Sequence, residues 1–118
     1  LVQSIGRAGD SILVGRGASF LLPRNETLSV RLVAPIPARA RRLSERLGVS
    51  VRTARRAARD LDRRSARFIR ALHRADPNDP HIYDLVIDTH SLGLSITVDV
   101  ICSAVESGRP RPPQNPLI

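Results

Sequence analysis

The sequence predicts an α/β domain in which short parallel strands alternate with helices. Three short apolar segments, at residues 11–14, 28–34 and 85–87, are near-continuous hydrophobic runs, as expected of strands covered on both faces. Helical patterns lie between them, and a last helix is expected from 95 to about 107. Because this alternation is typical of a parallel sheet with helices packed on it, we expect three parallel strands and at least three helices.

The composition limits the core that such a domain can build. The chain has 118 residues and is 42% hydrophobic, but it contains only one Tyr, two Phe and no Trp or Met. Its single cysteine, Cys102, excludes an internal disulfide and is expected to be a buried small hydrophobe. No run approaches the roughly 20 apolar residues that cross a bilayer, and no signal peptide is visible. We therefore expect a cytoplasmic protein without a membrane partner.

The two central helices have clear start and end signals. A proline at position 37 begins a helix that runs to Leu47 and ends at Gly48. Ser50 is a good N-cap for a second, much longer helix over 51–73. The Pro-rich turn at 76–80 then leads to the third strand.

The long helix carries two stripes of residues at spacings of three and four. One is an apolar seam, and the other consists of arginines. The seam is Val51, Ala54, Ala58, Leu61, Ser65, Phe68 and Leu72; the arginines are 52, 56, 59, 63, 67, 70 and 74. Like charges one turn apart cost about 0.2–0.5 kcal/mol per pair in an isolated helix. Residues 39–74 carry 13 Arg and 3 acids, whereas residues 75–118 carry 2 Arg and 6 acids. The sequence therefore predicts an anionic partner for this segment.

The arginines have three interpretations. In the first, they form a lid that closes over a polyphosphate. In the second, they contact the backbone of a nucleic acid. In the third, they have no binding function and are a solvated face in a chain that has 19 basic residues and no Lys at all. Residues 42–60 also have the pattern of a bacterial helix-turn-helix, with a glycine in the turn and a basic second helix. That helix is too long for a recognition helix, and strands flank it. We therefore keep a DNA-binding regulator only as the alternative function, and we expect no nucleic acid partner.

Three turns follow the expected strands at their carboxyl ends, where parallel sheets bind ligands. Arg16 lies between two glycines, which allow a phosphate to approach closely; on the tripeptide alone, a tight turn with a solvated Arg is the better interpretation. Asp88 and Thr89 are suited to contacting a base or a metal-bound water, or to capping the next helix. The three histidines lack metal-ligand spacing, so no protein metal site is expected.

Taken together, the order and spacing of several segments resemble the cytidylate kinase-like family, a branch of the P-loop nucleoside monophosphate kinases. The segments are 14–18, 30–35 followed by Arg39 and Arg42, 46–50, Asp62 with 68–70, 79–80 and 83–89. The resemblance covers roughly residues 5–105. It implies part of a three-layer P-loop kinase fold with a helical, Arg-rich lid.

The resemblance also implies an activity. The intact protein would transfer the γ-phosphoryl group of ATP to a nucleoside monophosphate such as CMP, with Mg²⁺ bridging the phosphates. The implied catalytic residues are Arg59, Arg63 and Arg64; the implied acceptor-binding residues are Arg16, Gly17 and Asp62; those near ATP are Arg39, Arg42, Asp88 and Thr89.

Two departures from the family pattern limit the activity that the resemblance implies for this chain. Ser65 stands where the lid motif Asp-x-x-Arg has its arginine, so Arg63 or Arg64 would have to supply that charge. The P-loop G-x-x-x-x-G-K-[ST] needs a lysine, which this chain lacks. We therefore expect residues 1–106 to be the carboxyl-terminal part of the domain, with the lid at about 39–74 and a disordered Pro-rich tail over 107–118. Such a piece is expected to be inactive alone and to self-associate through its exposed sheet edge. Three explanations are open: a fragment of an incomplete gene or assembly, which a first residue other than Met favours, one half of a split enzyme, or a degenerate binding remnant.

Overall fold

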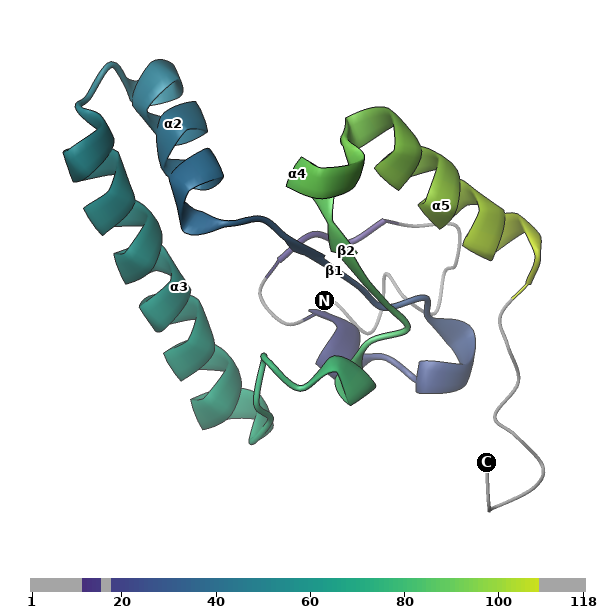
Figure 1. The fold of residues 1–118 in the computed structure, drawn as a ribbon. Helices are drawn as coiled ribbons and strands as arrows, with labels where there is room; N and C mark the ends of the chain where they lie inside the picture. The colour runs from purple at the N-terminus through teal and green to yellow at the C-terminus, as the bar shows by residue number, and fades with distance from the viewer. Residues whose placement is uncertain (1–11, 16–17, 109–118) are drawn as a thin grey trace.

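A computed structural model describes residues 12–15 and 18–108 of the chain (Figure 1). The described elements, in chain order, are the 3₁₀ turns η1 (Ala18–Leu21) and η2 (Arg24–Glu26), strand β1 (Val30–Val33), helices α2 (Ile36–Leu47) and α3 (Val51–His73), turn η3 (Pro80–Ile82), strand β2 (Leu85–Asp88), and helices α4 (Thr89–Leu92) and α5 (Leu94–Glu106). The expected α/β class is confirmed.

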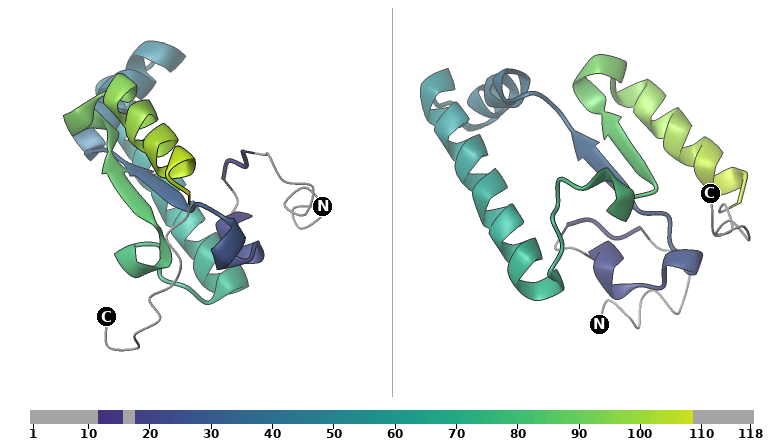
Figure 2. Two further views of the ribbon diagram at one scale, coloured as in Figure 1. Left: turned by 90° about the vertical axis from the view of Figure 1, so that its right-hand side faces the viewer. Right: turned by 60° about the horizontal axis from the view of Figure 1, so that its bottom comes forward.

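The sheet consists of two parallel strands. Val30 lies opposite Leu85 and Val33 lies opposite Asp88, so both strands have their carboxyl ends at the same edge of the sheet. Helix α3 lies on one side of the strands and α5 on the other, which places the sheet between helices (Figures 1 and 2).

The first expected strand, over 11–14, is not found in the described part of the chain. Residue 11 lies outside it, and residues 12–14 have no strand conformation. Ile12 and Val14 are 93% and 91% exposed. A strand requires backbone hydrogen bonds to a neighbouring strand, and no described strand lies beside these residues. The expectation of three paired strands was therefore wrong for this structure.

The two central helices have the expected boundaries to within one residue. Gly48 follows α2 with a φ of 67°, the left-handed conformation that glycine adopts readily. Its backbone N–H donates to the carbonyl of Ser44 at 2.9 Å. The side chain of Ser50 accepts a hydrogen bond of 3.1 Å from the N–H of Thr53, which makes it the N-cap of α3.

Small residues bring these two helices together. Ala40 of α2 and Ala54 of α3 are fully buried, and Ala58 of α3 is 3% exposed. The predicted seam is therefore confirmed at Ala54 and Ala58, whereas Val51 at its start is 43% exposed. It fails beyond Ala58, because Leu61 and Leu72 are 62% and 63% exposed.

The failure has a geometric cause. A seam repeating every 3.5 residues drifts by about 20° per heptad around a straight helix of 3.6 residues per turn. Helix α2 is also only 12 residues long, against 23 for α3, so it cannot cover the whole of its partner. Phe68 and Ser65, which were placed on the same seam, are accordingly exposed as well.

The last helices differ from expectation in two respects. Helix α4 was not predicted; it begins because the carboxylate of Asp88 accepts the backbone N–H groups of His90 and Ser91, both at 3.0 Å. Cys102 is exposed rather than buried. The covered face of α5 instead includes Thr97, which is 2% exposed and donates its hydroxyl to the carbonyl of Gly93.

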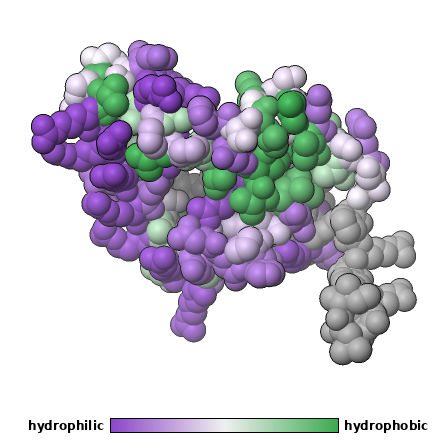
Figure 3. Space-filling model, in the orientation of Figure 1, coloured by the Kyte–Doolittle hydropathy of each residue, from purple (hydrophilic) through white to green (hydrophobic). Residues whose placement is uncertain are grey.

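The core of the described residues is small. Its buried hydrophobic residues are three alanines and Ile87, whereas fifteen large hydrophobic side chains are exposed. Figure 3 shows apolar surface gathered over α4 and α5, and hydrophilic surface over α2 and α3. Among the described helices, none combines the length and the apolar character that crossing a membrane requires.

Candidate functional site

Three of the predicted site residues, Arg39, Asp88 and Thr89, lie where the two strands end, whereas Arg59, Asp62, Arg63 and Arg64 lie in the middle of α3. Helix α2 begins three residues after β1, and α4 begins directly after β2. Because the strands are parallel, the first turn of α2 and the pair Asp88 and Thr89 lie at the same edge of the sheet. This edge is where parallel sheets bind ligands. Thr89 is linked to it directly, since its hydroxyl lies 3.4 Å from the carbonyl of Val33.

Arg39 and Asp62 form a two-pronged ion pair between α2 and α3. The Arg39 Nη2 atom lies 2.6 Å from Asp62 Oδ1, and Nη1 lies 2.8 Å from Oδ2. These hydrogen bonds lower the pKa of the Asp62 carboxyl below its ordinary value, with a smaller contribution from the charge of Arg31. They also raise the pKa of the Arg39 guanidinium. Two residues predicted to contact nucleotides therefore contact each other.

Arg39 retains N–H donors that its ion pair with Asp62 does not use. A guanidinium carries five N–H donors, and the two bonds to Asp62 use one hydrogen of each terminal nitrogen. The other donors remain free to bind an anion, because the carboxylate occupies only one side of the planar group. Asp62 meanwhile fixes the orientation of the guanidinium and the distance between the two helices.

The arginines of residues 39–74 form a strongly basic surface. We call α2, α3 and their connection, together with Arg74, the arginine hairpin. Its ion pairs with described residues are those of Arg39 with Asp62, Arg63 with Asp60 at 3.2 Å, and Arg70 with Asp76 at 3.6 Å. The other ten arginines are exposed and form no ion pair with any described residue: 41, 42, 46, 52, 55, 56, 59, 64, 67 and 74.

Asp88 is engaged as the cap of α4. One of its oxygens accepts both N–H groups of the helix start, so the interpretation as a helix cap describes its observed contacts. Among the described residues, no group of three or more His, Cys, Asp or Glu is arranged to hold a metal ion. The described side chains therefore do not fit a Mg²⁺ site by themselves, and we derive no step through that ion.

Arg16 and Gly17, two further predicted site residues, lie outside the described part of the chain. The preceding Gly15 has a φ of 78°, a left-handed conformation that side chains disfavour. A turn at the end of this segment is consistent with the Gly-Arg-Gly sequence.

Arg31 is a candidate that sequence analysis did not single out. Its guanidinium donates to Asn78 at 3.1 Å and lies 5.7 Å from the centre of the Tyr83 ring. Together with side chains of both strands it lines a cavity of about 200 Å³; the others are Val33, Asn78, Pro80, Tyr83 and Val86. The available signal was an arginine within an otherwise apolar strand.

The aromatic residues form a cluster next to this cavity. The ring of Phe20 stacks on His73 at 5.0 Å and meets Tyr83 at 6.4 Å, and Phe68 meets His73 at 6.2 Å. The hydroxyl of Tyr83 donates to the carbonyl of Pro77 at 3.0 Å. Burial raises the pKa of this phenol above its ordinary value. His73 is half-buried in this cluster.

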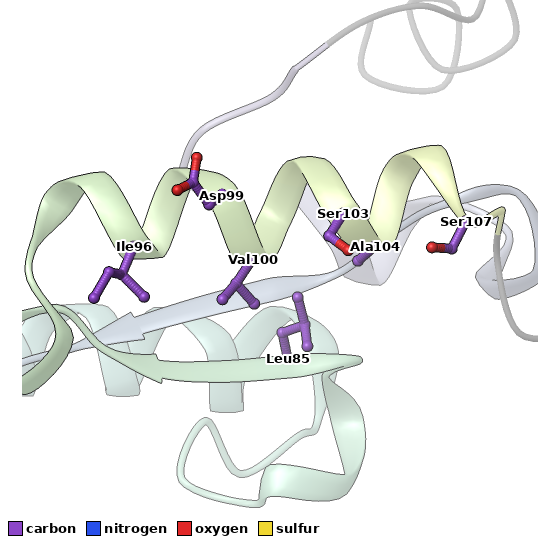
Figure 4. A pocket seen from close by; sticks show the side chains of 7 residues that line it. All are labelled: Leu85, Ile96, Asp99, Val100, Ser103, Ala104 and Ser107. Atoms are coloured by element: carbon purple, nitrogen blue, oxygen red, sulfur yellow. The ribbon is translucent and has the colours of Figure 1, made fainter.

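A second cavity, of about 410 Å³, is lined by none of the predicted site residues. It lies between α5 and β2, where Leu85, Ile96 and Val100 point toward one another while Asp99 points away from the strand (Figure 4). Serines and an alanine complete the lining: Ser103, Ala104 and Ser107. Because no basic side chain lines it, this cavity is not suited to a phosphate.

Comparisons with known proteins agree on one family. A family model described as the cytidylate kinase-like family matches residues 1–91. The chain is 32% identical to the cytidylate kinase of Methanopyrus kandleri over 107 residues, which are 83% of this chain and 55% of the relative. It is 38% identical to the cytidylate kinase of Pyrococcus horikoshii over 85 residues, or 70% and 43% of the two chains.

A third relative, the cytidylate kinase of Methanocaldococcus jannaschii, is 27% identical over 106 residues, which are 87% of this chain and 60% of that protein. The chain thus spans roughly half the length of the curated relatives that it matches. No solved structure gives a significant match.

Proposed function

Because the chain belongs to the cytidylate kinase-like family, we propose that it supplies the carboxyl-terminal part of a nucleoside monophosphate kinase. In this proposal residues 1–106 belong to the kinase domain, and the arginine hairpin is its lid. The intact protein transfers the γ-phosphoryl group of ATP to CMP or a similar acceptor. The alternative of a helix-turn-helix regulator has no support from the family model or from the relatives reported above, which are cytidylate kinases.

The position of the arginine hairpin carries the proposal. It starts at the carboxyl end of β1, where ligands of parallel sheets lie. Ten of its arginines form no ion pair with any residue that the structure describes, and they give it the charge that a polyphosphate requires. Phosphoryl transfer spreads negative charge over the transferring group, and arginines stabilise that charge.

Each predicted residue has a role in this proposal. Arg59, with Arg63 or Arg64, stabilises the transferring phosphoryl group. Arg16, Gly17 and Asp62 lie on the acceptor side, where Asp62 acts by positioning Arg39. Arg39 and Arg42 contact the phosphates of ATP, and the pair Asp88 and Thr89 lies beside its base.

The phosphate loop must come from outside these residues. The loop that holds the β- and γ-phosphates of ATP in P-loop enzymes contains a lysine, and the 118 residues contain none. The relatives are longer than the matched region, so they have room for such a segment. ATP and Mg²⁺ would therefore bind only when that segment is present.

A fusion tests the proposal. The part of the Methanopyrus kandleri relative that this chain does not match is joined in front of residues 1–118. Release of ADP is measured with ATP, Mg²⁺ and each nucleoside monophosphate in turn. We expect turnover that is highest with CMP, and a fusion without residues 36–74 as the control is expected to have none.

Two results would contradict the proposal. A folded fusion that binds ATP but phosphorylates no nucleoside monophosphate excludes the kinase function. Turnover that persists without the hairpin excludes its role as the lid.

A further inference from the structure

One face of α3 consists of arginines alone. Successive residues of an α-helix lie about 100° apart around its axis. On this geometry, six arginines of α3 fall within a sector of about 80°, and no other residue of the helix falls within it. We call these six residues the outer row: Arg52, Arg56, Arg59, Arg63, Arg67 and Arg70.

The outer row faces away from the packed side of α3. Ala54 and Ala58, which are buried where α2 packs on α3, lie on the opposite side of the helix axis. All six arginines of the row are exposed. Arg63 pairs with Asp60 and Arg70 with Asp76, and the other four form no ion pair with any residue that the structure describes. The row is therefore an accessible line of positive charge.

The outer row is longer than the phosphates of one nucleotide. From Arg52 to Arg70 it spans about 27 Å along the helix axis. Arg59 and Arg63, which have a role in the proposed phosphoryl transfer, lie in its middle, and the row extends about 10 Å beyond them in each direction. Its neighbouring arginines are one helical turn apart and repel one another. A ligand that relieves this repulsion along the whole row must itself carry a line of negative charges.

We propose that the outer row binds the phosphate backbone of a nucleic acid duplex. Duplex DNA carries one negative charge per about 1.7 Å of its axis, so it presents phosphates along the full length of the row. No nucleic acid partner was expected from the sequence, because α3 is too long for a recognition helix. Contacts to phosphates need no recognition helix, and they carry no sequence information. The binding is therefore independent of base sequence and of the kinase activity.

Two other phosphate-bearing partners fit the row less well. A helix that binds a membrane surface inserts an apolar face into it. The exposed apolar residues of α3, Leu61, Phe68 and Leu72, lie on the side opposite to the row, so a membrane that took them up would leave the row in water. Single strands are held largely by bases that stack on aromatic side chains, and the sector of the row contains none.

The first test measures binding of the full chain to labelled duplexes by fluorescence anisotropy. Duplexes of about 20 base pairs are roughly 68 Å long, which exceeds the length of the row. Two unrelated DNA sequences and the matching RNA duplexes are compared, and the tighter complex identifies which nucleic acid supplies the backbone. If the row contacts about four to six phosphates, the affinity for DNA should fall about 10²–10³-fold between about 0.05 and 0.2 M salt. The fall should be the same for both sequences.

Two double variants that remove the same charge locate the binding surface. Arg52→Gln with Arg56→Gln changes the outer row, and Arg41→Gln with Arg46→Gln changes two exposed arginines of α2. Gln forms helices about as well as Arg, so both variants should fold. The first should weaken binding about tenfold or more and make the salt dependence shallower by about two phosphate contacts. The second should stay within about threefold of wild type, because distant charges are screened at about 0.1 M salt.

The wild-type chain provides a second test that needs no variant. A dicarbonyl reagent modifies accessible arginines, and mass spectrometry locates the modified residues. The duplex should protect Arg52, Arg56 and Arg67 of the outer row. Arg41 and Arg46 should react as fast in the complex as in the free chain.

Four outcomes would overturn the inference. The first is that no duplex binds even at the lowest salt concentration. The second is that both double variants weaken binding equally, and the third is that the duplex protects all five arginines alike. The fourth is that single strands, phosphatidylserine vesicles or polyglutamate bind as tightly as the duplex. None of these measurements involves ATP or turnover, so this inference and the proposed kinase function can fail separately.

Discussion

The ion pair between Arg39 and Asp62 yields a prediction about stability. Asp62→Asn removes the charge that holds α2 against α3 and keeps the size of the side chain. The pair has short, two-pronged contacts, but its side chains are 32% and 50% exposed. Solvent screening therefore limits its contribution to about 0.2–1 kcal/mol, and its geometry places it at the upper end of that range. A loss of about 1 kcal/mol lowers the Tm of a domain of this size by roughly 4–8 °C.

The stabilisation by this ion pair depends on pH, and the direction follows from the pKa of Asp62. The folded state lowers the pKa of Asp62, so the pair stabilises the protein above the ordinary pKa of the carboxyl. The stabilisation is lost as the pH falls through the lowered value, where the carboxyl is protonated in both states. Urea unfolding followed by circular dichroism should therefore show Asp62→Asn as less stable at pH 7, and the difference should vanish in acid.

The matched control is Asp60→Asn on the same helix. Asp60 pairs with Arg63 three residues away, within α3, and joins no second helix. Its replacement should cost about 0.3–0.5 kcal/mol at most. The reasoning fails if Asp62→Asn costs no more than Asp60→Asn, or if the difference between wild type and Asp62→Asn is unchanged in acid.

Two further predictions concern the hairpin. In the fusion, Arg63→Ala and Arg64→Ala show which arginine replaces the one absent at Ser65. Replacing that arginine should lower kcat by about 10²-fold, whereas the kcat of Arg67→Ala should stay within about twofold of the unmodified fusion. An equal response of all three would refute a specific role. Gly48→Ala should cost about 1–2 kcal/mol in urea unfolding because of the left-handed backbone alone, since an added Cβ meets nothing within 4 Å. An unchanged stability would show that the turn relaxes freely.

The local part of the fold could be predicted from the sequence. The end of α2 and the start of α3 depend on a glycine turn and a serine cap, which act over a few residues, and both function as expected. Helix α4 was not predicted because it is only four residues long, and because its N-cap, Asp88, was also a candidate for contacting a ligand. Pairing of the segment 11–14 depends on a neighbouring strand, and sequence patterns do not show whether one is present.

The site was predictable in its residue types and less so in its contacts. The exposed arginine stripe follows from helical spacing, and the structure confirms that these side chains are exposed. The link between Arg39 and Asp62 joins residues 23 positions apart and depends on how closely the alanines let two helices approach. The contacts of Arg31 likewise needed the turn that brings Asn78 and Tyr83 to β1.

The contacts of Tyr83 make it a natural optical probe. The chain has a single Tyr and no Trp, so its ultraviolet fluorescence comes almost entirely from one ring. That ring meets Phe20, Arg31 and the carbonyl of Pro77, which belong to three separate segments of the chain. A change in its emission therefore reports the junction of η1, β1 and the turn before β2, with no label attached. Comparing that signal with circular dichroism, which follows the helices, would show whether the sheet and the hairpin unfold together.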